Sequence, residues 1–277
     1  MKILRKMLSV VLSSVVVLSC GSVLHADTGI EIDKSNFPDR HFRNFLQIMY
    51  DCNMDWCLDS NEIAKITSIG SEKRDYQIDD LYDVTSFQGI EYLTNLETFH
   101  LAGIDVESLD LSKNTKLKDI ELSSCTSLEH LKVGSGVTHL YLASCINLFD
   151  MDLSQAYNLE SMTLTPFGMV PKILTNKTLD LSACSKLSYL YVAWIPLTNI
   201  KFSSNITKLE VDVDCGTRIK YLDFSTCKSL TYLKITGEDV TSIDLPTQLF
   251  TIYSSKYRVS GDSSYGTYKG NGCTLIF

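Results

Sequence analysis

A short apolar motif recurs along most of this 277-residue chain and constrains its fold more than any other feature. The motif has the form L-x-x-L-x-L, with Ile, Val, Met or Phe sometimes replacing Leu, as in "LKDIELSSC", "VTHLYLASC" and "IKYLDFSTC". The alternating L-x-L part is typical of a short strand with two apolar side chains inward and the middle one outward. Because one such strand cannot bury its apolar side alone, stacked copies must share a core.

The central apolar positions of these copies define the predicted coil. They are Phe99, Leu109, Ile120, Leu131, Leu140, Met151, Met162, Leu179, Leu190, Ile200, Leu209, Leu222, Leu233 and Ile243. Successive positions lie 9 to 11 residues apart, except for 17 residues from Met162 to Leu179 and 13 from Leu209 to Leu222. Two half-repeats make a coil of about 21 residues. We therefore predict a mainly β solenoid with short strands on two faces and an insertion at residues 165–176.

The repeats resemble leucine-rich repeats of the short bacterial kind with alternating "LDLS" half-units, over about residues 85–253. In that family, Asn or Cys stands inside the turn, three residues after the last apolar position of the motif. The matching residues are Asn114, Cys125, Cys145, Cys184, Asn205 and Cys227. The resemblance implies small, buried ladder residues with free thiols. A Cys125–Cys145 disulfide is the alternative, and Cys215 and Cys273 have no evident partner.

The first 26 residues predict a secretory signal peptide, with a basic start, an apolar run and cleavage after Ala26. An alternative is lipidation of Cys20, because "VLSC" at residues 17–20 looks like a lipobox. The segment holds three basic residues, so the remaining chain has 22 basic and 33 acidic residues, a net charge of −11. An acidic surface argues against nucleic acid or an anionic membrane as partner. We expect a secreted or cell-surface monomer.

Residues 27–84 differ in composition from the repeats and should form an N-terminal helical cap, because a solenoid end exposes an apolar coil face. "FPDRHFRNFLQIMY" predicts a helix with Pro38 in its first turn. A second helix should begin at Asp59 as N-cap, with Glu62 completing a capping box. A short C-terminal cap is expected at residues 254–277.

The stretch "DCNMDWCLDSNE" at residues 51–62 lies between these helices and has the ligand spacing of a calcium-binding EF-hand loop. Its expected metal ligands are Asp51, Asn53, Asp55, Cys57 through its carbonyl, Asp59 and Glu62. The sixth place normally holds Gly and here holds Trp56, for which a left-handed conformation costs about 1–2 kcal/mol. Many secreted bacterial leucine-rich-repeat proteins have a similar start, followed by segments like "EIAKITSI" and "GIEYLTNL". Calcium, a plain capping turn and a Cys52–Cys57 disulfide all stay open for this loop.

The sequence contains no G-x-S-x-G elbow, P-loop or H-E-x-x-H motif. "SGDSSYG" at residues 260–266 is typical of a turn. We therefore expect a binding protein and no enzyme, with a hydrolase as a further alternative because fold never excludes a grafted site.

The outward residues of alternate half-repeats predict two different faces. One face carries Asp110, Lys132, Asp152, Asp180, Lys201, Asp223 and Asp244. The other carries His100, Glu121, Tyr141, Thr163, Tyr191, Glu210 and Lys234, preceded at the previous outward place by Asp119, His139, Tyr189, Lys208 and Tyr232. The first is expected to be a solvated acidic surface, and the second is richer in Tyr and His.

Tyrosine at outward positions offers a large, rigid contact area and is enriched in binding sites. We predict a partner-binding surface for a cell-surface protein or glycan, formed by His139, Tyr141, Tyr189, Tyr191, Trp194 and Tyr232. Two alternatives stay open: these tyrosines simply favour exposed strands, and the chain is a structural or adhesive surface lipoprotein without a defined ligand.

Overall fold

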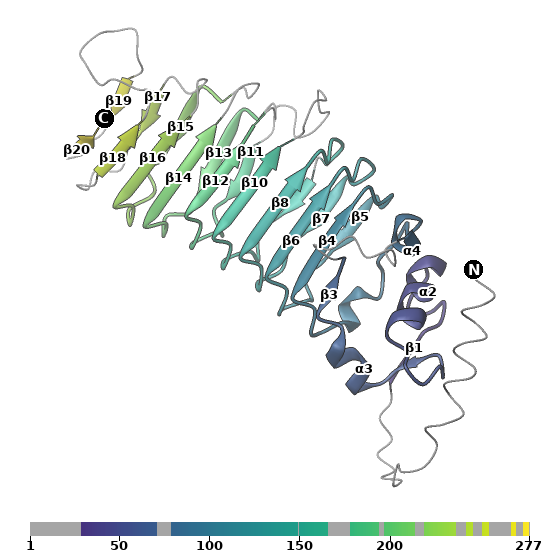
Figure 1. Cartoon of the computed structure of the whole chain (residues 1–277). Helices are drawn as coiled ribbons and strands as arrows, with labels where there is room; N and C mark the ends of the chain where they lie inside the picture. Colours follow the sequence, from purple (N-terminus) through teal and green to yellow (C-terminus); the bar gives the residue numbers. More distant parts are fainter. Residues whose placement is uncertain are drawn as a thin grey trace.

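The computed structural model describes residues 29–70, 79–148, 150–165, 178–193, 197–213, 219–236, 242–245, 251–254, 267–269 and 274–276. Within these ranges the chain is a β-solenoid whose coils stack in sequence order, with short helices at the N-terminal end (Figure 1). The predicted fold class is therefore confirmed. No helix among the described residues is long and apolar enough to cross a membrane.

One face of the solenoid is a single parallel sheet of ten strands, called the long sheet. Its strands are β3 (Ser68–Ile69), β4 (Thr98–Ala102), β6 (Asp119–Ser123), β8 (His139–Ala143), β10 (Ser161–Thr165), β12 (Tyr189–Val192), β14 (Lys208–Val213), β16 (Tyr232–Thr236), β18 (Thr251–Ser254) and β20 (Thr274–Ile276). Because β3 precedes residue 85 and β20 follows residue 253, the sheet extends beyond both ends of the predicted repeat region.

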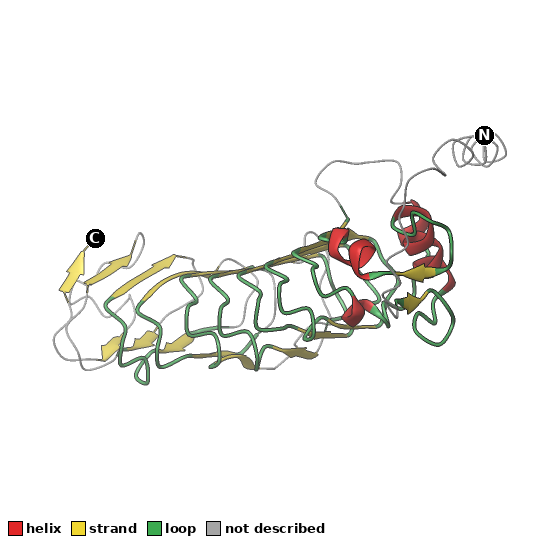
Figure 2. Ribbon diagram, turned by 90° about the horizontal axis from the view of Figure 1, so that it is seen from below, coloured by secondary structure: helices red, strands yellow, loops and turns green. Residues whose placement is uncertain are grey.

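The opposite face holds two parallel sheets, called the short sheets (Figure 2). The first contains β5 (Ser108–Asp110), β7 (His130–Lys132) and β9 (Asp150–Asp152). The second contains β11 (Thr178–Leu181), β13 (Asn199–Phe202), β15 (Tyr221–Asp223), β17 (Ser242–Asp244) and β19 (Thr267–Lys269). Each coil therefore supplies one strand to the long sheet and one to a short sheet, as the half-repeat pattern predicts.

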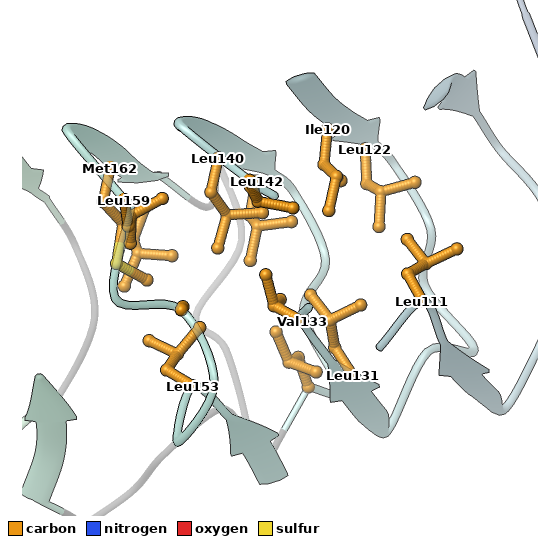
Figure 3. Close-up of a cluster of buried hydrophobic side chains, with 14 of the residues drawn as sticks. Leu111, Ile120, Leu122, Leu131, Val133, Leu140, Leu142, Leu153, Leu159 and Met162 are labelled. Atoms are coloured by element: carbon orange, nitrogen blue, oxygen red, sulfur yellow. The ribbon is translucent and has the colours of Figure 1, made fainter. Parts of the chain in front are cut away.

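The core lies between the two faces and is made of the repeated apolar positions. Ile120, Leu122 and Leu140 point inward from the long sheet, and Leu131 points inward from β7 (Figure 3). All four are at most 3% exposed. Fully burying each such side chain contributes about 1.5–3 kcal/mol, so the stacked coils supply most of the drive to fold.

The turns after the strands bury small residues, as the resemblance implies. Asn114, Cys125, Cys145, Cys184 and Cys227 are all buried. The four cysteines are free thiols, so the Cys125–Cys145 disulfide is not formed.

The two asparagines predicted at these turn positions differ from each other. The Asn114 side-chain amide donates to the carbonyls of Ile90, at 2.8 Å, and Leu93, at 3.1 Å, and so ties its coil to the one before. The prediction for Asn205 is wrong, because Asn205 is exposed and Ser203 is buried in its turn instead.

The Asp of the "LDLS" half-units makes a hydrogen bond to the backbone. In four short-sheet turns, an Asp carboxylate accepts a hydrogen bond from the backbone N–H of the Ser two residues later, at 2.8–2.9 Å. The pairs are Asp110–Ser112, Asp152–Ser154, Asp180–Ser182 and Asp223–Ser225. Asp side chains commonly stabilise turns in this way. These carboxylates are therefore structural as well as solvated.

The N-terminal cap closes the first coil with short elements. They are β1 (Ile30–Glu31), α2 (Arg40–Met49), β2 (Cys57–Leu58), α3 (Ser60–Lys65), α4 (Asp79–Tyr82) and the 3-10 helix η1 (Ile90–Tyr92). The N-cap of α2 is Asp39, so Pro38 precedes the helix and does not lie in its first turn. Phe87 lies between Phe42 of α2 and Phe99 of β4, with ring centroids 5.0 and 5.2 Å away, and so joins cap to solenoid.

Several predictions fall outside the described residues. They concern the signal peptide at residues 1–26 with Cys20, the insertion, of which only Thr165 is described, and Trp194, Cys215 and Cys273. Most of the predicted C-terminal cap lies outside as well.

Candidate functional site

The outward residues of the long sheet align in rows that cross the strands. One row, called the tyrosine row, runs through β6, β8, β10, β12 and β14. It consists of Glu121, Tyr141, Thr163, Tyr191 and Asp212. Parallel pairing holds these residues level, about 4.8 Å apart from strand to strand. The row therefore reads acid, tyrosine, threonine, tyrosine, acid, with His100 of β4 beyond Glu121.

The adjacent row on the same face contains two more of the predicted residues. It consists of Asp119, His139, Ser161, Tyr189, Glu210 and Lys234. His139 and Tyr189 are exposed and lie two strands apart, with Ser161 between them. His139 Nδ1 is 2.9 Å from the Thr138 hydroxyl. The structure thus places His139 and Tyr141 on β8 and Tyr189 and Tyr191 on β12, on the same face of the sheet with β10 between them.

Tyr232 is placed differently from its predicted position. The repeat alignment makes it equivalent to Tyr189, but the structure pairs Tyr189 with Glu210 and Tyr232 with Lys208. Tyr232 therefore lies two residues nearer the start of its strand than Lys234, which is level with Glu210 and Tyr189, and so falls outside both rows. It still borders the surface, because its hydroxyl lies 3.5 Å from Glu210 Oε1.

The same shift explains why Asp212 is absent from the sequence-based surface. The structure aligns Leu190 with Val211, whereas the repeat alignment uses Leu209. A slip of two residues keeps every side chain on the correct face but moves it along its strand into the adjacent row. A sequence signal for the true register exists: with Val211 as the central position, the steps from Ile200 and to Leu222 both become 11 residues.

The carboxylates of this surface differ in their partners. Glu210 accepts a hydrogen bond from Lys234 Nζ at 3.0 Å. Glu121 and Asp212 form no hydrogen bond or ion pair among the described residues. Burial raises the pKa of the Tyr189 hydroxyl, and the nearby charges of Asp212 and Glu210 raise it further. The surface is therefore electronegative around its tyrosines.

The predicted calcium loop adopts a compact turn held by its own acidic side chains. Asp51 is buried, and its two carboxylate oxygens accept from the backbone N–H groups of Asp55, at 3.2 Å, and Trp56, at 3.0 Å. Glu62 is also buried and accepts from the N–H groups of Cys52, at 2.7 Å, and Asp59. The capping box between Asp59 and Glu62 is confirmed.

Several of the predicted calcium ligands make hydrogen bonds within the loop itself. No group of three or more His, Cys, Asp or Glu side chains that could hold a metal ion occurs among the described residues. Trp56 does adopt the left-handed conformation that the sixth loop place requires, with φ of 63°. Cys52 and Cys57 are free, so the alternative disulfide is not formed. Calcium binding stays a prediction.

No protein-family model matches the chain, and no curated protein matches it. Among solved structures, an internalin (inlF) from Listeria monocytogenes is 18% identical with a TM-score of 0.41, over 91% of this chain and 74% of that one. Internalin C2 (inlC2) from the same organism is 18% identical with a TM-score of 0.39, over 93% and 100%. The functional domain of InlJ from Listeria monocytogenes, which includes a cysteine ladder, is 14% identical with a TM-score of 0.22, over 92% and 74%.

Proposed function

We propose that the long sheet is a protein-binding surface and that the chain works as a binding module of a bacterial protein at or outside the cell surface. The observation that carries this proposal is the alignment of Tyr141, Tyr189 and Tyr191 on β8 and β12, in two adjacent rows of one exposed face. Tyr189 is 38% exposed, whereas the next residue of its strand, Leu190, is fully buried.

Physical reasons favour a binding role for this arrangement. Tyrosine presents a large apolar ring with a polar tip and loses little entropy when it is ordered. The rings stand on strands whose inward residues Leu140 and Leu190 are buried, so the backbone beneath them is already fixed. Binding on this face therefore requires little further ordering of the protein. Solenoids use such extended sheet faces for binding.

A photo-crosslinking comparison of the two faces tests the proposal. A photoreactive phenylalanine analogue replaces Thr163, between the tyrosines, or Thr178, an exposed outward residue of β11 on a short sheet. Each full chain is irradiated with a display library of extracellular protein domains. We expect crosslinks from position 163 that excess parent chain suppresses and that a Tyr141→Ser/Tyr191→Ser double variant does not suppress.

Two results would overturn the proposal. One is equal crosslinking from positions 163 and 178, and the other is full competition by the double tyrosine variant. A glycan array run with the same variants separates the second candidate partner. Tyrosine-dependent glycan binding without any protein crosslink would replace protein by glycan as the ligand, and binding that ignores the tyrosines would favour a structural surface component.

We also propose, separately, that the loop at residues 51–62 takes up calcium weakly and stiffens the cap. The left-handed Trp56 and the four acidic side chains support it, while the hydrogen bonds already made by Asp51 and Glu62 compete with it. Trp56 is 51% exposed, so its fluorescence is a suitable probe in a Trp194→Phe background. We expect a calcium-dependent change in the parent that Glu62→Gln abolishes. No change in the parent would leave only a capping turn.

A further inference from the structure

We infer that the tyrosine row recognises the cationic side chains, Arg or Lys, of a protein segment. This inference rests on the proposed function and names the chemistry of the partner. It follows from the order of residues in the row, in which each outer position is a carboxylate and each adjacent position a tyrosine. Neither an aromatic patch nor an acidic patch alone would have this alternation.

Each half of the row forms a tyrosine–carboxylate pair. Tyr141 is level with Glu121 on the neighbouring strand, and Tyr191 is level with Asp212. Adjacent strands lie about 4.8 Å apart, and a cation is attracted to an aromatic face within about 6 Å of its centre. One guanidinium or ammonium group can therefore stack on the ring and contact the carboxylate at the same time.

Neither carboxylate of the two pairs is in direct contact with a described lysine or arginine, and Lys234, which is bound to Glu210, acts on Asp212 only through its charge. Glu121 and Asp212 form no hydrogen bond or ion pair among the described residues, and β6, β8, β10 and β12 carry no Lys or Arg at all. Lys118, just before β6, is 3.3 Å from Glu97, and Lys234 is paired with Glu210. Lys208 at the start of β14 is the other lysine in the described strands of the long sheet, and it is level with Tyr232, outside the tyrosine row.

The adjacent row contains a third tyrosine–carboxylate pair that serves as an internal contrast. Tyr189 is level with Glu210, but Glu210 already binds Lys234 Nζ at 3.0 Å. An incoming cation must displace this lysine, so binding at this pair is less favourable. The inference therefore assigns the main contacts to the tyrosine row and a minor one to Tyr189.

The spacing of the two pairs restricts the partner further. Tyr141 and Tyr191 are two strands apart, about 10 Å, with the smaller Thr163 between them. A polyproline II segment repeats every three residues with a rise of about 3.1 Å per residue. Basic residues three apart on such a segment lie about 9 Å from each other on one face and match the two pairs.

Synthetic peptides test the inference with the full chain. The probe is a proline-rich peptide containing Arg-Pro-Pro-Arg. One control has Gln in place of each Arg, and a second has Arg-Arg-Pro-Pro, which keeps the charge but not the spacing. Binding is measured by fluorescence anisotropy at low and high salt. We expect the probe to bind more tightly than either control, and high salt to weaken it.

A matched pair of charge variants tests the protein side. Glu121→Gln/Asp212→Asn removes both acids of the tyrosine row, and Asp180→Asn/Asp223→Asn removes the same charge from a short sheet. We expect about tenfold weaker probe binding in the first variant and no more than about twofold in the second. Circular dichroism of both variants checks that they fold like the parent.

The outcomes separate this inference from the proposed function. No probe binding to the parent, equal binding of the Gln peptide, or parent-like binding by Glu121→Gln/Asp212→Asn would each overturn cation recognition. If that charge variant still competes for partner crosslinking and the double tyrosine variant does not, the binding surface stands and only its cationic partner fails. If both variants compete like the parent, the proposed function fails as well.

Discussion

The aspartates of the short sheets and the two acids of the tyrosine row on the long sheet differ in what they contact. On the short sheets, Asp180 accepts from the backbone N–H of Ser182 and is 3.1 Å from Lys201, and Asp152 follows the same scheme with Ser154 and Lys132. On the long sheet, Glu121 and Asp212 have no such partner among the described residues. Net charge alone therefore does not identify a binding face. What matters is which carboxylates the fold has already engaged.

Tyrosines show the same division between the faces. Tyr221 on the short-sheet strand β15 donates a hydrogen bond to Asp244 at 2.6 Å, and this bond raises its pKa to about 12. The raised pKa of Tyr189 on the long sheet has burial as its main cause, followed by the charges of Asp212 and Glu210. Tyr221 is hydrogen-bonded to a carboxylate of its own sheet, whereas Tyr189 is influenced by nearby carboxylates through their charge.

The largest expected effect is a loss of stability that is similar for both faces, because the two faces share one core. Leu140→Ala on β8 and Leu131→Ala on β7 each delete a side chain that is 2% exposed. Each should lower the free energy of unfolding by about 2–5 kcal/mol, through lost burial and the cavity left behind. Urea unfolding of the two variants measures this. A cost below about 1 kcal/mol for either would mean that its sheet does not close the core.

The next effect tests the contrast between engaged and available acids. Asp180→Ala removes the acceptor for the Ser182 N–H and should cost about 1 kcal/mol. Glu121→Gln and Asp212→Asn remove no hydrogen bond or ion pair to a described residue and should stay within about 0.5 kcal/mol of the parent. Thermal or urea unfolding at neutral pH compares the three. If Asp212→Asn lowers the free energy of unfolding as much as Asp180→Ala does, the contrast between engaged and available acids is wrong.

Much of the fold can be predicted from the sequence because it depends on one local rule repeated many times. The alternation of apolar residues identifies the strands and their inward faces, and the number of copies identifies a solenoid. Asn114 and the buried cysteines follow from their fixed place after each strand. Asn205 occupies the same nominal place yet is exposed, because its turn buries Ser203 instead. Turn geometry of this kind is not encoded in the apolar pattern.

The candidate surface is less predictable because it depends on register between strands. The outward tyrosines are visible in the sequence, since each stands between two apolar residues. Asp212 is not, because a parallel pairing shifted by two residues preserves the same inward and outward pattern. The role of the short-sheet aspartates is also hidden, since it lies in a hydrogen bond to the backbone two residues later.

A smaller effect is the pH dependence of the stability that Asp152 contributes. Hydrogen bonds from Ser154 hold the pKa of Asp152 below its usual value of 3.8, and Lys132 lowers it further. A depressed carboxyl pKa contributes stability that is present above the unfolded value and is lost as pH falls through the folded one. The destabilisation caused by Asp152→Ala should therefore be full above about pH 4 and shrink below it. Unfolding midpoints of parent and variant across this range measure the change, and a constant difference down to low pH would contradict it.

The smallest effect distinguishes the two tyrosines by titration. Tyr221 should ionise near pH 12, and Asp244→Asn should return its pKa toward 10, because the acceptor charge that holds the hydroxyl proton is gone. A raised tyrosine pKa contributes stability fully below about pH 10, and that contribution is lost as pH rises through the folded value. Asp212→Asn should lower the pKa of Tyr189 by less, since burial, its main cause, is unchanged. Ultraviolet difference titration, with Tyr221→Phe and Tyr189→Phe identifying each signal, measures both shifts. A larger shift at Tyr189 than at Tyr221 would place the more committed tyrosine on the long sheet and reverse the contrast between the two faces.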